Sequence, residues 1–270
     1  MILISNLNNI SEKYKNLYKY IILTDTIKDI NAVYSNIDQY SDFVHSVILR
    51  SAAPVIFSGI KKEFGKIPLV VFSRELGSKK LFLKNTESYK IQNVKYYLSS
   101  ALKENFFSVK MISSLGINTG IYFDEQIEWD FMYELIEYSV KNGKTNAELQ
   151  PLSFIINNYK NKEIDYNDVY FNDPLKYLYI NKEDYIFLNY RNFIENKPFA
   201  AISNDSFQSV MDKIALHIEN EKKLLLADLN ECSSCAAWKI CLGKFSYIND
   251  KKNTCSKCFS LLIDNLLNSQ

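Results

Sequence analysis

All five cysteines of this 270-residue chain lie between residues 232 and 258, and none precedes them. They are Cys232, Cys235, Cys241, Cys255 and Cys258, with the spacing C-x2-C-x5-C-x13-C-x2-C. Two residues between cysteines allow both sulfurs of one turn to face the same ion, while N–H groups of the turn stabilise the thiolate charge. The sequence therefore predicts a metal site, with these five cysteines as candidate ligands.

The spacing is compatible with two kinds of metal centre. Zn²⁺ in a zinc ribbon would take Cys232, Cys235, Cys255 and Cys258, which leaves Cys241 unused. An iron–sulfur cluster would take Cys232, Cys235 and Cys241 with one ligand from the second pair. Both alternatives stay open from spacing alone.

The rest of the sequence indicates a reducing compartment and gives the protein almost no net charge with which to attract a partner. The N-terminus has no basic region and only a short apolar stretch, so we expect no export signal and a cytoplasmic location. In the cytoplasm a cysteine cluster binds metal more often than it forms disulfides. The chain has 32 basic and 31 acidic residues, which argues against nucleic acid or a membrane surface as the partner.

The elements that must position these cysteines follow from apolar runs and helical periodicity. We predict strands at 18–25, 46–51, 67–74, 78–85, 108–115, 117–123 and 185–190, with a further strand beginning within 147–154. We predict helices at about 27–40, 88–104, 124–143, 205–221 and 258–270. Asp124 is a candidate cap for the third of these helices and Gly143 a candidate C-terminal cap. Residues 160–183 are predicted to form a long loop or irregular insert.

Continuous apolar strands separated by helices predict an α/β fold with a parallel sheet covered on both faces. A doubly wound sheet and a partial or complete barrel both fit this pattern. We expect this α/β domain to occupy residues 1–222 and a small cysteine-rich, metal-binding domain to occupy residues 223–270.

The stretch CSSCAAWKICLGKF resembles the core motif of the SPASM domain, a C-terminal auxiliary-cluster domain of radical SAM enzymes that modify peptides and proteins. That motif reads C-x2-C-x5-C-x3-C, followed by a later cysteine. Cys232, Cys235 and Cys241 match its first three positions, Gly243 matches a Gly-rich position, and Phe245 stands at the fourth cysteine. In the family the fourth cysteine serves a different cluster, so the resemblance implies one 4Fe-4S cluster, completed by Cys255 or Cys258.

The front of the chain lacks the C-x3-C-x2-C loop that holds the catalytic cluster of radical SAM enzymes. The chain is thus similar to the pseudo-radical-SAM/SPASM proteins of ribosomal peptide (RiPP) maturation systems, including the grasp-with-spasm type with its ATP-grasp ligase. This resemblance implies a degenerate, barrel-like radical SAM fold. It also implies an accessory protein that binds a precursor peptide or its modifying enzyme.

No catalytic residue is assigned from the sequence, because it contains neither a nucleophile elbow nor a phosphate-binding loop. We expect His45 and His217 to be packed or surface residues. The alternative function is a metal-independent enzyme that uses carboxylates or tyrosines and carries a structural zinc-ribbon tail.

The acidic residues before the third helix, the two tryptophans and the tyrosine-rich segment can each be explained without a catalytic role. The acidic residues from Asp124 to Asp130 would complement a helix dipole. Trp129 would fill the core, whereas Trp238, inside the cysteine segment, would shield the metal. The tyrosines of 166–190 suit a peptide-binding surface, but a chain with 19 tyrosines explains them equally well.

Overall fold

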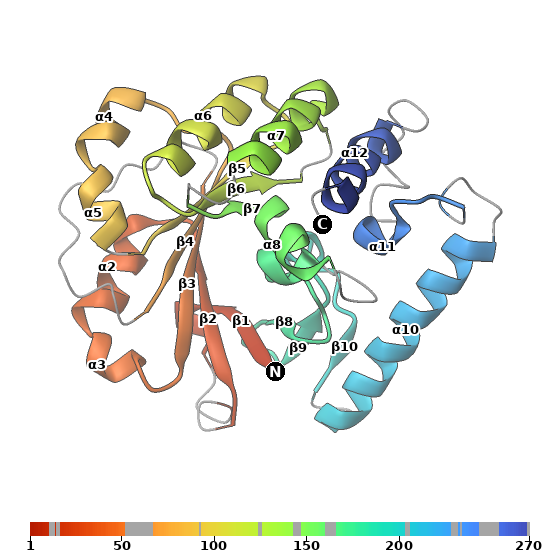
Figure 1. The fold of residues 1–270 in the computed structure, drawn as a ribbon. Coiled ribbons are helices and arrows are strands. Elements are labelled where there is room, and N and C mark those ends of the chain that lie inside the picture. Colours follow the sequence, from red (N-terminus) through yellow and green to blue (C-terminus); the bar gives the residue numbers. More distant parts are fainter. Residues whose placement is uncertain are drawn as a thin grey trace. The chain divides into compact units, whose positions relative to one another are not determined.

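The computed structural model describes residues 1–10, 14, 17–51, 67–91, 93–123, 126–142, 147–159, 166–202, 206–227, 232, 234–242 and 254–268. Within these ranges the chain is an α/β protein with a largely parallel ten-stranded sheet, in the order β10-β9-β8-β1-β2-β3-β4-β5-β6-β7 (Figure 1). The predicted α/β class with a parallel sheet is therefore confirmed. The chain divides into two compact units, Met1–Tyr96 with Tyr170–Leu216 (unit 1) and Tyr97–Val169 with His217–Gln270 (unit 2).

Most strands of unit 1 contain runs that are buried on both faces, whereas the edge strand β10 is only half-buried. The strands are β1 (Ile2–Asn6), β2 (Lys19–Thr24), β3 (Val44–Ser51), β4 (Leu69–Ser73), β8 (Tyr177–Ile180), β9 (Tyr185–Phe187) and β10 (Ala200–Ala201). The pairs β8–β1, β1–β2, β2–β3 and β3–β4 are parallel, whereas β8–β9 and β9–β10 are antiparallel. Burial of both faces explains why β2 and β4 consist almost entirely of apolar residues.

Short helices connect the strands of unit 1. They are α2 (Ile27–Ser35), α3 (Ile37–Tyr40), α4 (Lys79–Lys84), α5 (Thr86–Ile91) and α9 (Tyr190–Ile194), with the 3-10 turn η1 (Leu7–Asn9) after β1. Helix α2 begins where the Thr26 hydroxyl accepts a hydrogen bond from the Asp29 amide. Its Tyr34 hydroxyl donates to the Ile67 carbonyl oxygen at 2.8 Å, which ties the helix to the chain entering β4.

Successive strands from β1 to β7 are neighbours in the sheet. A doubly wound sheet reverses its strand order at a switch point, whereas a barrel-type sheet adds each new strand beside the previous one. The observed order, in which β8 returns to the other side of β1, is compatible with barrel-type winding.

Side chains from distant strands meet on one face of the unit 1 sheet. Arg50 of β3 and Tyr179 of β8 share this face but are separated by β1 and β2, or roughly 14 Å in a flat sheet. The Arg50 guanidinium nevertheless lies 4.1 Å from the Tyr190 ring centre, and the Tyr190 ring lies 6.3 Å from that of Tyr179. This convergence indicates that the face curves inward, as the inner face of a barrel-type sheet does.

Unit 2 contains the cysteines and the helices next to them. Its strands are β6 (Thr119–Tyr122), β7 (Leu149–Gln150) and most of β5 (Lys95–Ser99), and β6 pairs parallel with β7. Its helices are α6 (Lys103–Ser114), α7 (Trp129–Asn142), α8 (Leu152–Asn158), α11 (Trp238–Cys241) and α12 (Thr254–Asn268). Helices α6 and α7 lie side by side (Figure 1). The 3-10 turn η3 (Tyr166–Tyr170) and helix α10 (Phe207–Ala227) each cross a boundary between the units.

One predicted strand is a helix. Residues 78–85 form α4, because Ser78 caps a turn by accepting a hydrogen bond from the Leu81 amide. Phe82 is buried while Leu81 and Leu83 are exposed. The apolar run 81–83 is too short to distinguish the two-residue period of a strand from the 3.6-residue period of a helix. The Ser78 cap therefore decides that the segment is a helix.

Two further predictions between residues 86 and 115 are wrong. The predicted helix 88–104 is interrupted at Asn93, which has a left-handed φ of 49°, and its centre forms β5 with Tyr96 and Tyr97 both buried. The predicted strand 108–115 belongs instead to α6, in which Val109 and Ile112 are buried at helical spacing.

The predicted loop 160–183 contains η3 and β8, and the strand β1 was not predicted. Asp173 organises the entry to β8, because its carbonyl oxygen accepts hydrogen bonds from the amides of Lys176 and Tyr177. The predicted caps Asp124 and Gly143 lie outside the described residues. None of the helices in the described ranges combines the length and apolarity needed to cross a membrane.

His45 on β3 makes the stability of the protein depend on pH. The His45 side chain is exposed, but desolvation by its neighbours, followed by repulsion from Lys95 and Lys19, lowers the pKa of His45 below its usual value. Below about pH 6.5 the unfolded chain therefore binds a proton that the folded chain does not, so the free energy of unfolding falls as pH falls. The fall ends once the pH is below the folded pKa.

We expect urea midpoints measured at pH 7.5 and 5.5 to differ less for His45→Asn than for the wild type. An equal pH dependence in the two proteins would show that His45 does not contribute to this effect.

Candidate metal centre

The first three cysteines occupy one compact run of turn and helix. Cys232 and Cys235 are half-buried, and the Cys235 amide donates to the Cys232 carbonyl oxygen at 3.2 Å. The Trp238 amide donates in turn to the Cys235 carbonyl oxygen at 3.0 Å and begins α11. Cys241 is the last residue of that helix and only 6% exposed. The turn thus brings the main chain of Cys232 and Cys235 close together, as a C-x2-C ligand pair needs.

Helix α11 is fixed at both ends. Leu242 has a left-handed φ of 49°, and its amide closes the helix on the Trp238 carbonyl oxygen at 2.9 Å. The Lys239 ammonium donates to the carbonyl oxygen of Tyr159, the residue after α8, and lies 4.4 Å from the centre of the Tyr159 ring. Within unit 2, this contact fixes the segment between Cys235 and Cys241 to the end of α8.

The second pair of cysteines lies at the beginning of α12. Cys255 and Cys258 are three residues apart on this helix, so they lie on neighbouring positions of one face. Cys258 is 3% exposed, and its thiol donates to the Trp129 carbonyl oxygen at 3.6 Å. Burial, followed by repulsion from Cys255 and Asp130, raises the pKa of Cys258 to about 12.

The structure places the cysteines as two local groups. None of the five is in a disulfide. Among the residues that the structure describes, which include all five cysteines, no three His, Cys, Asp or Glu side chains are grouped so that they could hold an ion. The thiols of each C-x2-C pair are therefore spaced as metal ligands require. The structure does not, however, bring three thiols to one point.

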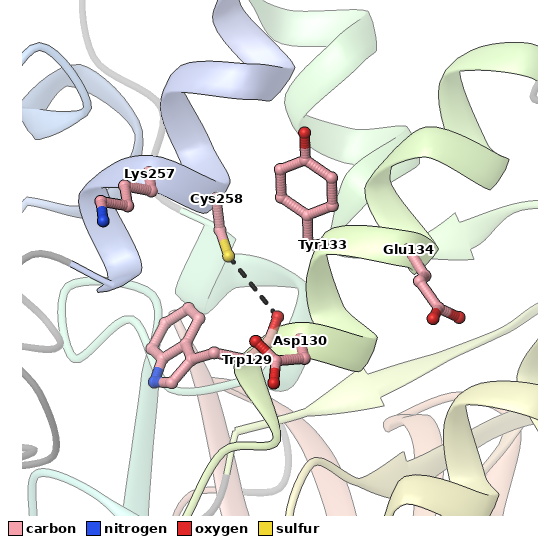
Figure 2. A pocket seen from close by; sticks show the side chains of 6 residues that line it. All are labelled: Trp129, Asp130, Tyr133, Glu134, Lys257 and Cys258. Carbon is pink, nitrogen blue, oxygen red and sulfur yellow. Dashed lines mark hydrogen bonds between the residues drawn. The ribbon is translucent and has the colours of Figure 1, made fainter.

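A pocket of about 360 Å³ opens beside Cys258, between α7 and α12. Its lining residues are Trp129, Asp130, Tyr133, Glu134, Lys257 and Cys258. Figure 2 shows the Cys258 thiol between the rings of Trp129 and Tyr133. Glu134 also forms an ion pair with Lys110 at 3.6 Å. Aromatic faces beside carboxylates can bind a basic or amide group, which is the chemistry of a peptide contact.

Half of the residues of this pocket were not singled out in the sequence. Asp130 belongs to the acidic group that we assigned to the helix dipole, and Trp129 is buried as expected for a core residue. Tyr133, Glu134 and Lys257 were missed. The available signal was the four-residue spacing of Trp129 with Tyr133 and of Asp130 with Glu134, which places each pair on one helical stripe.

The structure places the other candidate residues, His217 and the tyrosines of 166–190, as follows. His217 lies on α10 beside Glu221, with 3.8 Å between Nε2 and the carboxylate oxygen. Tyr170 and Tyr179 are buried, whereas Tyr185 is exposed. The tyrosine-rich segment therefore contributes partly to the core.

The chain matches no family model, no curated protein and no solved structure. The functional assignment consequently rests on the cysteines, the sheet and the pocket described above.

Proposed function

We propose that the protein is an accessory component of ribosomal peptide maturation whose C-terminal segment, residues 223–270, holds a cysteine-ligated metal centre. In this role it binds a precursor peptide or the enzyme that modifies it, such as an ATP-grasp ligase. The observation that carries the proposal is the confinement of all five cysteines to residues 232–258, with each C-x2-C pair on a single turn or helical turn.

The ligand set depends on the metal. A 4Fe-4S cluster would be held by Cys232, Cys235 and Cys241 with Cys255 or Cys258, whereas Zn²⁺ would use both C-x2-C pairs. In either case the bound metal supplies a cross-link between chain segments and offsets the negative charge of its thiolates. Reducing conditions in the cytoplasm, where we place the protein, would keep these thiols available.

Two features of the large domain support a binding role in a degenerate, barrel-like radical SAM fold. Successive strands are neighbours from β1 to β7, and the unit 1 sheet has an inward-curving face. The chain also has no cysteine before Cys232 with which to hold a catalytic cluster. A protein of this kind would recognise a peptide without starting radical chemistry.

The pocket between α7 and α12 supports contact with a peptide near the cysteines. Its two carboxylates and two aromatic rings are suited to a basic or aromatic side chain. A contact at this place would link metal binding to partner binding, because Cys258 lines the pocket.

Substitution of the first cysteine pair tests the proposal. We expect Cys232→Ser/Cys235→Ser to lose its metal and, in affinity capture followed by mass spectrometry, to lose the precursor peptide or ligase bound by the wild type. Ser234→Ala, an exposed change between the two cysteines, is the matched control and should keep both.

A metal-free double variant that still captures the same partner would separate the metal from the function. A variant that retains the full metal content would contradict the ligand assignment. A metal-independent enzyme with a zinc tail would give catalytic turnover that survives every change of the tail that leaves unit 2 folded.

A further inference from the structure

Arg50 lies at the carboxyl end of the inward-curving face of unit 1. It is the penultimate residue of β3 and pairs in register with Phe72, the penultimate residue of β4. Tyr179 is the penultimate residue of β8 and points to the same face. In barrel-type α/β proteins, ligands bind at the carboxyl ends of the strands. Arg50 therefore occupies the level of the sheet at which a ligand is expected.

Aromatic rings fix the Arg50 guanidinium. Its central carbon lies 4.4 Å from the centre of the Phe72 ring and 4.1 Å from that of the Tyr190 ring. Such contacts hold the cation in place, but ring faces do not satisfy the N–H donors that lie in the guanidinium plane. The ring contacts thus position the side chain and leave its in-plane donors available for an acceptor.

Two buried polar groups at this place have no partner. Arg50 Nε is buried and has no hydrogen-bond acceptor among the described residues. The Tyr179 hydroxyl is also fully buried and has no partner at normal hydrogen-bond geometry, although the Arg50 side chain approaches it. Burial raises the pKa of Tyr179, and the positive charge of Arg50 together with its hydrogen-bonding approach to the hydroxyl partly opposes this rise. Unsatisfied buried donors beside a fixed cation are unusual unless an acceptor binds there.

We propose that Arg50 and Tyr179 bind an oxyanion, a carboxylate or a phosphate group, on the inner face of unit 1. The guanidinium fork matches two oxygens of either group, and the tyrosine hydroxyl supplies a further donor. This site goes beyond the proposed function and does not depend on the metal centre, because all of its residues belong to unit 1.

Titration of the full-length protein with inorganic phosphate and, separately, with succinate tests the site. The readout is the side-chain Nε–Hε resonance of Arg50 in nitrogen-15 NMR spectra, identified by its loss in Arg50→Met. We expect a saturable shift with at least one probe, and the tighter probe identifies the ligand as a phosphate or a carboxylate.

Variants locate the contribution of each group. Arg50→Met keeps an apolar chain between the rings and should weaken binding of the preferred probe, measured by calorimetry, by about tenfold or more. Arg50→Lys keeps the charge without the fork and should weaken it by a smaller factor, as should Tyr179→Phe. Arg191→Met is the matched control, because Arg191 is an exposed arginine on α9 that pairs with Glu195, and it should bind like the wild type.

The absence of saturable binding of both probes to the wild type would overturn the proposal. Equal binding by Arg50→Met, folded by circular dichroism, would also overturn it. If Arg50→Met does not fold, Tyr179→Phe and the wild-type NMR titration decide the question on their own.

Discussion

Phe259→Ala should lower the free energy of unfolding of unit 2 by about 3–5 kcal/mol, the usual cost of removing a buried aromatic side chain. Phe259 is fully buried on α12, and its ring meets the Trp129 ring of α7 edge to face at 6.5 Å. Cys258 and Leu262 are buried on the same helix, so Phe259 lies at the centre of the contact that holds α12 on α7. Urea unfolding followed by tryptophan fluorescence measures the change, because Trp129 is part of the contact.

Leu267→Ala is the matched control for this substitution. Leu267 lies on the same helix but is 57% exposed, so its removal should change the free energy of unfolding by less than about 0.5 kcal/mol. If Phe259→Ala and Leu267→Ala cost the same, α12 does not pack on α7 as described. Since Cys255 and Cys258 precede Phe259 on α12, we also expect Phe259→Ala to reduce the metal retained by the protein.

Gly120→Ala should destabilise unit 2 although alanine is normally the better residue in a strand. Replacing glycine in a strand usually gains about 0.5–1 kcal/mol through the unfolded state. At Gly120, however, an added Cβ would lie 2.3 Å from the Gln150 carbonyl oxygen and 2.9 Å from its carbonyl carbon. These are main-chain atoms of the paired strand β7, so they cannot move aside without displacing the strand.

We expect the clash at Gly120 to exceed the gain and the free energy of unfolding to fall by about 1–3 kcal/mol or more. Ser114→Thr adds one carbon at an exposed position of α6 in the same unit and serves as control. Urea midpoints of the two variants provide the comparison. A stability of Gly120→Ala equal to or above that of the wild type would mean that β6 and β7 are not in this register.

The elements that were predicted correctly are those with a long and unambiguous apolar pattern. β2 and β4 are nearly continuous apolar runs because they are buried on both faces, and β3 has such a run at its centre. Helices α7, α10 and α12 have enough turns to show helical periodicity. Between residues 78 and 115 the apolar runs are short, and local caps and a left-handed residue at Asn93 decide the structure. β8 was missed because its two tyrosines lie in a largely polar neighbourhood.

The candidate ligands were found from the sequence because their spacing is local. The pocket and the Arg50 site were not, because their residues come from segments far apart in the chain. Arg50, Phe72, Tyr179 and Tyr190 become neighbours only through the strand order and the curvature of the sheet. No local pattern in the sequence carries that information.

The metal content and absorption spectrum of the wild-type protein, purified without oxygen, test the central claim most directly. The claim is that four of the five cysteines, drawn from Cys232, Cys235, Cys241, Cys255 and Cys258, together hold a metal centre. It predicts either about four irons per chain with broad absorbance near 400 nm, or a colourless protein with about one zinc per chain. A protein that contains less than about a tenth of a metal ion per chain, with all five thiols reactive toward a thiol reagent in the folded state, would contradict it.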